Sequence, residues 1–186
     1  MFRAMWSLTL ISAGGLGISG GLYNAAGFGV FRTLGITFMT MLYHFGVRLI
    51  VGGILSAVRI DEAFCRRKYF QPLSFEKGLY RRLRVREWKK KAPTYAPEEF
   101  DISRHSFQEL IIASCRAETV HIINVLISFV PLLFSLKFGS FAVFLLTSLA
   151  GAVFDMIFVI IQRFNRPRLV RLAERRTKIS NEAVSG

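Results

Sequence analysis

Cysteine, histidine and acidic residues are scarce in this chain. The two cysteines, Cys65 and Cys115, lie far apart with no C-x-x-C spacing, which argues against a disulfide scaffold and a zinc ribbon. No N-x-S/T sequence is present, so nothing indicates a glycosylated outer face. Only 12 Asp and Glu stand against 25 Lys and Arg. Such a basic excess indicates phosphate-bearing partners, either nucleic acid or the head groups of lipids and cofactors.

Long apolar runs are what the chain has in abundance. Apolar residues make up 52% of it and the mean hydropathy is +0.40 although 20% of the residues are charged, so the charges must be segregated from the apolar runs. Four runs each supply the ~20 residues that cross a bilayer core; they cover residues 5–30, 34–58, 110–136 and 141–161. We therefore expect an all-α integral membrane bundle of about four helices, forming a single domain over residues 1–186. Because the cations flank apolar runs, lipid is the expected partner and nucleic acid is not.

The first run is rich in glycine and admits several interpretations. Gly15 to Gly20 match the pattern G-x-G-x-x-G, but no strand precedes them and no acidic residue follows at a suitable distance for dinucleotide binding. Close helix packing through Gly17 and Gly21 is the preferred interpretation. A signal peptide is an alternative, since Arg3 precedes the run. The length of the run and the lack of an A-x-A site favour a retained span.

Lysine and arginine are distributed very unevenly among the connections, and this predicts the orientation. Residues 59–104 hold thirteen of them and the segment after residue 161 holds seven, whereas the two other connections hold one each, Arg32 and Lys137. Positive residues are retained on the cytoplasmic side. We therefore expect a multi-pass protein of the cell membrane with the middle loop (59–109), the tail (162–186) and both termini in the cytoplasm.

The middle loop is too long for a simple connector and not apolar enough to span the membrane. From Phe75 to Trp88 its apolar residues recur at spacings of three to five among cations. This pattern predicts a basic amphipathic helix at the cytoplasmic interface, ended by Pro93 and Pro97; a solvated linker is the alternative. Either Ser103 or Ser106 is expected to cap the third span, and Ser106, three residues before Glu109, has the spacing of a capping box.

Ionisable residues inside apolar runs are costly and are therefore functional candidates. In the third run, Glu118 and His121 lie on one helix face. They form an E-x-x-H pattern, but the chain's only other histidines, His44 and His105, cannot complete a di-iron site. No metal or other cofactor is expected. In the fourth run Asp155 is isolated, with Arg48 and His44 of the second run as candidate partners.

Depth in the membrane brings a group of polar residues to one level at the cytoplasmic mouth of the bundle. The group comprises Arg116, Glu118, His121, Gln162, Asn165, Arg166 and Arg168. His121 has an imidazole that titrates near neutral pH and is the candidate general base. Glu118, one turn away, is expected to orient it. The Arg and Asn side chains are candidate ligands for a phosphate or an oxyanion, with Trp88 and Lys89 of the loop above them. Alternatively, Glu118 pairs with Arg166 or Arg168 and only ties the two helices together.

Four short stretches resemble the glycosyl-4,4′-diaponeurosporenoate acyltransferase family, between about Ser74 and Leu169. They read FEKGLY, VREWKKKAP, CRAETVH and QRFNRPRL, starting at Phe75, Val85, Cys115 and Gln162. Ile122 after the histidine and Ala92 before the first proline depart from the family pattern.

The resemblance implies transfer of a fatty acyl group to a hydroxyl of a glycosylated carotenoid-type acceptor. The partners would then be a membrane lipid, an activated acyl donor such as acyl-CoA, and a lipid or glycosylated isoprenoid acceptor. Two other functions stay open from the residues alone. One is a different lipid-modifying transferase, such as a methyltransferase, and the other is a non-enzymatic protein that binds lipid or acts as a scaffold.

Overall fold

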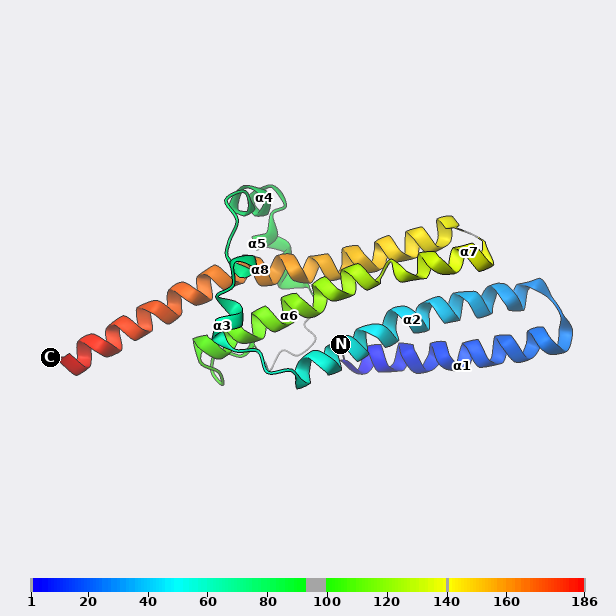
Figure 1. Cartoon of the computed structure of the whole chain (residues 1–186), viewed down its shortest axis with the longest axis horizontal. Helices are drawn as coiled ribbons and strands as arrows, with labels where there is room; N and C mark the ends of the chain where they lie inside the picture. Colours follow the sequence, from blue (N-terminus) through cyan, green and yellow to red (C-terminus); the bar gives the residue numbers. More distant parts are fainter. Residues whose placement is uncertain (1, 93–99, 140, 186) are drawn as a thin grey trace. The chain divides into compact units, whose positions relative to one another are not determined.

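The chain is helical throughout the part described by the computed structural model, which covers residues 2–92, 100–139 and 141–185, and no strand occurs there (Figure 1). The long helices are α1 (Phe2–Ala26), α2 (Gly29–Ala57), α6 (Phe107–Ile127) and α8 (Phe141–Ser185). The short ones are α3 (Glu62–Cys65), η1 (Lys68–Phe70), α4 (Glu76–Arg82), α5 (Val85–Trp88), η2 (Lys89–Lys91), η4 (Val130–Phe134) and α7 (Ser135–Phe138).

Four helical segments are long and apolar enough to cross a membrane, which confirms the predicted membrane fold class. They cover Arg3–Ala26, Gly29–Ala57, Phe107–Phe138 and Phe141–Ile179. Their ends differ from the predicted ones. The first connection lies at Gly27, whose positive φ of 68° suits glycine, so Arg32 belongs to α2. The last helix does not end at Ile161 but continues through the basic tail to Ser185.

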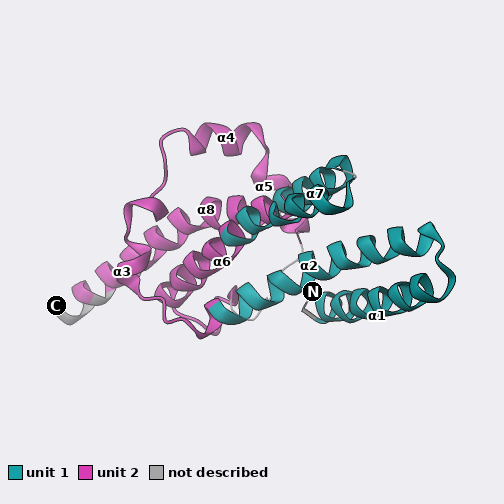
Figure 2. Ribbon diagram, turned by 45° about the vertical axis from the view of Figure 1, so that its right-hand side comes forward, with its two compact units in different colours: residues 1–54, 123–153 teal, residues 55–122, 154–186 magenta. Residues whose placement is uncertain are grey.

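The chain forms two compact units (Figure 2). Unit 1 comprises residues 1–54 and 123–153, and unit 2 comprises residues 55–122 and 154–186. The helices α6 and α8 each contribute to both units. In unit 2 the part of α6 that carries Glu118 lies against the part of α8 that carries Arg163.

In unit 1, α1 and α2 form a hairpin that packs closely at Gly15. A β-carbon there would lie 2.6 Å from the Phe38 ring, so a larger residue would displace that ring. The prediction of close packing through Gly17 and Gly21 is wrong, because no atom of the described residues lies within 4 Å of a β-carbon built on either.

Proline determines where α6 ends. Pro131 has no N–H to donate to the carbonyl of Ile127, and this oxygen instead accepts a hydrogen bond of 2.8 Å from the Tyr43 hydroxyl of α2. The chain then continues as the 3-10 turn η4 and the short α7. The start of α6 has the predicted capping box: the Ser106 N–H donates to Glu109 (2.7 Å), whose own N–H donates to the Ser106 hydroxyl (3.3 Å).

A half-buried arginine in α2, Arg48, donates hydrogen bonds to oxygens from three segments of unit 1. Arg48 donates to the His44 carbonyl (2.6 Å), the Ser128 hydroxyl (3.1 Å) and the Gly151 carbonyl (3.1 Å). These bonds let a guanidinium lie inside an apolar span, where unpaired polar groups are costly.

The predicted single helix from Phe75 to Trp88 is wrong, because the structure divides it into α4 and α5. Arg84 stands between them in the left-handed conformation, with φ 50° and ψ 39°, which breaks the helical hydrogen-bond ladder. The Trp88 indole N–H bridges the break by donating to the Leu83 carbonyl at 2.7 Å. The predicted stops at Pro93 and Pro97 lie outside the described residues.

Candidate active site

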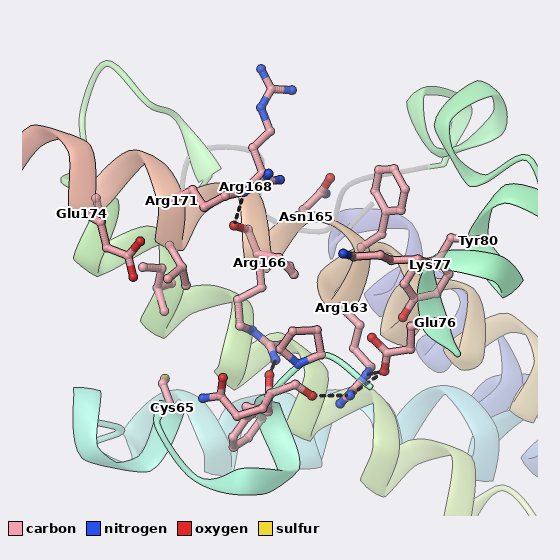
Figure 3. Close-up of a pocket in the computed structure, with 18 of the residues that line it drawn as sticks. Cys65, Glu76, Lys77, Tyr80, Arg163, Asn165, Arg166, Arg168, Arg171 and Glu174 are labelled. Carbon is pink, nitrogen blue, oxygen red and sulfur yellow. Dashed lines mark hydrogen bonds and ion pairs between the residues drawn. The ribbon is translucent and has the colours of Figure 1, made fainter. Parts of the chain in front are cut away.

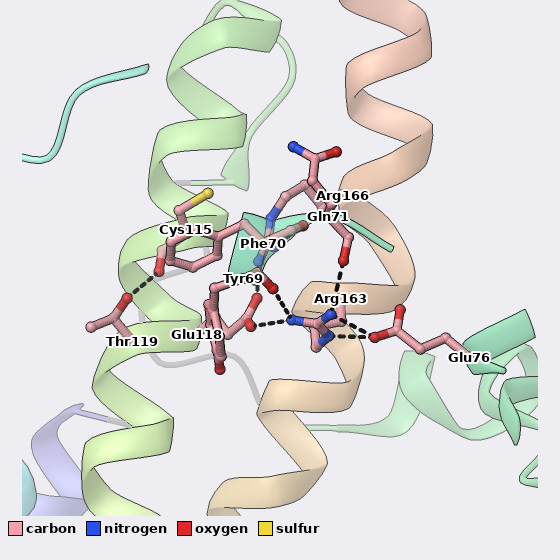
Figure 4. Close-up of polar contacts among 9 residues, drawn as sticks. All are labelled: Tyr69, Phe70, Gln71, Glu76, Cys115, Glu118, Thr119, Arg163 and Arg166. Atoms are coloured by element: carbon pink, nitrogen blue, oxygen red, sulfur yellow. Dashed lines mark hydrogen bonds and ion pairs between the residues drawn. The ribbon is translucent and has the colours of Figure 1, made fainter. Parts of the chain in front are cut away.

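A buried network of two arginines and two glutamates connects α4, α6 and α8 in unit 2 (Figure 4). Glu118 of α6 is fully buried. Its Oε1 accepts a hydrogen bond of 2.8 Å from Arg163 Nη1, and its Oε2 pairs with Arg166 Nη2. Arg163 also binds Glu76 of α4 with its Nε (2.7 Å) and Nη2 (2.6 Å). Buried charges are tolerated when they are paired and hydrogen-bonded in this way.

The same arginines hold the chain before α4 through its backbone. Arg163 donates to the carbonyls of Tyr69 (3.0 Å) and Gln71 (3.1 Å), and Arg166 donates to that of Phe70 (3.1 Å). All three nitrogens of Arg163 are therefore occupied by protein acceptors. Arg163 thus positions the loop and α4 on the helix pair and has no donor left for a ligand.

His121 forms a second pair with Asp155, separate from this network. The imidazole Nδ1 lies 2.8 Å from Asp155 Oδ1, and the ring stacks on Phe158 with centroids 4.7 Å apart and planes at 14°. Asp155 is 1% exposed, whereas the His121 side chain keeps 18% of its surface. The two contacts fix the ring in position and orientation.

The prediction that Glu118 orients His121 is wrong. Both Glu118 oxygens are engaged by Arg163 and Arg166, and Asp155 takes the orienting position. A carboxylate only accepts hydrogen bonds, so an ionised Asp155 places the imidazole proton on Nδ1 and leaves Nε2 as the basic nitrogen.

The other predicted residues occupy distinct places. Lys89 donates to Asn165 Oδ1 at 2.6 Å, and Arg168 is exposed on α8. Gln162 is buried, and Arg116 is half-buried. Within the described residues, the Arg116 Nε has no hydrogen-bond partner. Trp88 stabilises the fold of the loop by donating a hydrogen bond from its indole N–H to the Leu83 carbonyl.

Unit 2 also holds a large cavity of about 2020 Å³, lined by more Lys and Arg than carboxylates (Figure 3). Of the predicted residues, Lys89, Asn165, Arg166 and Arg168 line it. Glu118 and His121 do not, nor do Arg116, Gln162 and Trp88. The cationic cavity and the His121–Asp155 pair are therefore two separate features of this unit. No group of three His, Cys, Asp or Glu able to hold a metal ion is found among the residues described.

Burial changes the pKa of three side chains of the middle loop. It raises the pKa of Tyr80 to about 12, with the neighbouring Glu76 adding to the effect. Burial, and then Glu118, raise the pKa of Tyr69. Burial lowers the pKa of Lys89, and the nearby cations Arg168, Lys90 and Arg86 lower it further. Both tyrosines therefore stay neutral at physiological pH, and Lys89 lies in an electropositive environment.

Sequence reasoning missed Arg163 and Glu76, and it assigned Asp155 no catalytic role. Arg163 is one of seven cations in the tail and nothing in its spacing distinguishes it, and Glu76 stands in a basic loop with no periodic signal of its own. The rule that ionisable residues in apolar runs are functional candidates did select Asp155. That rule does not identify a partner 34 residues away.

These features define a helical membrane protein with a buried ion network, an Asp–His pair and a cationic cavity in the same compact unit. A sequence model of the glycosyl-4,4′-diaponeurosporenoate acyltransferase family matches residues 66–175, more than half of the chain, and the protein belongs to this family. The matched segment contains the ion network, the His121–Asp155 pair and most of the cavity wall. No curated protein and no solved structure matches the chain significantly.

Proposed function

We propose that the protein is an acyltransferase that moves a fatty acyl group from an activated donor to a hydroxyl of a glycolipid or glycosylated isoprenoid, of the carotenoid type. Family membership supports the reaction class. The observation that carries the proposal is the hydrogen bond from His121 Nδ1 to the buried Asp155, because it gives a partly exposed imidazole the tautomer of a general base.

The reaction then proceeds by direct attack. His121 Nε2 removes the proton of the acceptor hydroxyl as its oxygen attacks the acyl carbonyl carbon. The new C–O bond forms, the bond to the leaving group breaks, and the imidazolium returns its proton to that group. Asp155 stabilises the transient imidazolium, and stacking on Phe158 keeps the ring in place.

The remaining predicted residues take binding and positioning roles in this proposal. Lys89, Asn165 and Arg168 face the cavity and bind the donor, with Arg116 and Gln162 as further candidates. Glu118 and Arg166 hold the helices and the loop in register, which supports the helix-tying interpretation of this pair. The charge distribution supports a cell-membrane location with the loop, the tail and both termini in the cytoplasm.

Labelled substrates test the reaction class. Membranes that contain the protein are incubated with radiolabelled acyl-CoA or acyl carrier protein and, separately, with labelled S-adenosylmethionine, and the lipids are extracted. Acyl label should enter a glycolipid. Methyl label alone would indicate a methyltransferase, and no new labelled lipid would indicate a non-enzymatic role.

Two histidine variants test the proposed base. His121→Ala should lower the rate at least ~100-fold. His105→Ala is the matched control, since His105 lies near the surface beside Glu109 at 3.7 Å. Full activity in the His121 variant would eliminate the mechanism.

A further inference from the structure

One wall of the cavity carries cations that form no ion pair with any carboxylate of the described residues. Lys89 of η2 donates to Asn165 Oδ1 (2.6 Å) and lies over the Phe164 ring at 4.6 Å. Arg168, three residues after Asn165 on α8, is close enough to Lys89 to lower its pKa, as are Arg86 and Lys90. Among the described residues, neither Lys89 nor Arg168 forms an ion pair. This group, Lys89, Asn165 and Arg168, is called the cation cluster below.

The cation cluster is distinct from the neutralised network beside it. Figure 3 shows Asn165 and Arg168 pointing from α8 away from Arg163 and Arg166. Arg163 and Arg166 have their charge balanced by Glu76 and Glu118. An unbalanced group of cations on a cavity wall attracts a multiply charged anion, and ammonium and guanidinium groups suit phosphate.

The rise of α8 gives the axial separation between the base and the two residues of the cluster on that helix, Asn165 and Arg168. Asp155, which contacts His121, precedes Asn165 by ten residues and Arg168 by thirteen. At 1.5 Å per residue the separation along the axis is about 15 to 20 Å. A phosphate bound at the cluster therefore lies well away from an acyl carbon bound at His121.

This separation discriminates between donor chemistries. In a phospholipid only about five bonds join the phosphorus to an ester carbonyl carbon, roughly two peptide units, or at most about 7 Å. In a phosphopantetheine thioester about twelve bonds lie between the phosphate oxygen and the sulfur, equivalent to roughly four peptide units, or about 14 Å when extended. Only the second spans most of the distance, and the phosphate and thioester groups add the remainder.

We propose that the cation cluster binds the phosphate groups of an acyl phosphopantetheine thioester, whose arm extends along α8 to place the thioester carbonyl at His121. This inference rests on the acyltransferase function proposed above. The acceptor oxygen forms the ester bond as the C–S bond breaks, and the released thiolate takes the proton from His121. Coenzyme A and acyl carrier protein share this arm, so both are candidate sources.

Binding measurements test the cluster directly. The purified full chain in detergent is titrated with coenzyme A and with pantetheine, which has the same arm without phosphate. Coenzyme A should bind at least 10-fold more tightly than pantetheine. Lys89→Ala and Arg168→Ala should each weaken coenzyme A binding about 10-fold or more. Arg176→Ala is the matched control, because it removes one exposed α8 cation that does not line the cavity.

Transfer assays with three donors separate the sources. Transfer from acyl-CoA or from acyl carrier protein that falls in the Lys89 and Arg168 variants, but not in the Arg176 variant, supports the proposal and identifies the carrier. Equal losses in all three variants would show a non-specific charge effect and overturn it. Transfer from phospholipid vesicles alone would overturn the inference and leave the acyltransferase function intact. Transfer from none of the three donors would remove the proposed function itself, whereas His121→Ala should abolish transfer and keep coenzyme A binding.

Discussion

The Asp155 carboxylate determines which nitrogen of His121 carries the proton. In Asp155→Asn the amide N–H₂ can donate to Nδ1, which moves the imidazole proton to Nε2 and removes the base. We expect kcat to fall by ~100-fold or more with little change in KM, because the substituted side chain has nearly the same shape. Steady-state acyl transfer measures both constants. If kcat/KM fell equally but only through a higher KM, Asp155 would act on substrate binding and not on the tautomer of His121.

Glu118 is expected to matter for folding more than for chemistry. In Glu118→Gln the buried Arg166 and the half-buried Arg163 lose a shared counter-charge, and breaking a buried pair costs about 3–5 kcal/mol. Thermal unfolding in detergent should show a clearly lower midpoint. Glu62→Gln is the matched control, since the exposed Glu62–Arg66 pair at 3.2 Å is worth well under 1 kcal/mol. Equal midpoints for the two variants would contradict the structural role.

At this scale the sequence predicts which residues are unusual but not which ones meet. Glu118, His121 and Asp155 stand out because each is ionisable inside an apolar run. The spacing of Glu118 and His121 on one helix predicts that Glu118 orients His121. The contact that forms joins residues 34 positions apart on two helices, and only the packing of α6 on α8 creates it.

For the helices too, the sequence predicts what depends on a continuous local pattern and not what depends on a change within that pattern. Hydropathy predicts the long helices because a span needs one continuous property over ~20 residues. It does not predict the break at Arg84, where the apolar spacing continues while the backbone turns left-handed. Nor does hydropathy predict that α8 continues to Ser185, because the apolar run ends near Ile161 and the rest of the helix is basic.

Gly151 allows α8 to approach Arg48 in unit 1. A β-carbon at this position would lie 3.0 Å from Arg48 Nη2 and 3.3 Å from Ser128 Oγ. Gly151→Ala should therefore displace the guanidinium from its acceptors and cost about 1–3 kcal/mol. Thermal unfolding or denaturant titration in detergent measures the loss.

Gly52 of α2 provides the control for this substitution. No atom of the described residues lies within 4 Å of a β-carbon built there. Alanine is the better helix former by roughly 0.5–1 kcal/mol, so Gly52→Ala should be neutral or slightly stabilising. A Gly151→Ala variant as stable as Gly52→Ala would show that the close approach to Arg48 is not needed.

Across the whole molecule, charge and hydropathy together predict one topology. Four spans put the thirteen cations of residues 59–104 and the seven after residue 161 on the same side of the membrane. Any odd number of spans between the loop and the tail would place one of these groups across the membrane, against the retention of positive residues in the cytoplasm. An alkaline phosphatase fused after Lys137 should therefore be active outside the cytoplasm, and a fluorescent protein fused after the last residue should fluoresce inside it. A cytoplasmic reporter at Lys137 would contradict the topology. It would also place the basic loop that carries Lys89 outside the cytoplasm, away from a cytoplasmic thioester donor.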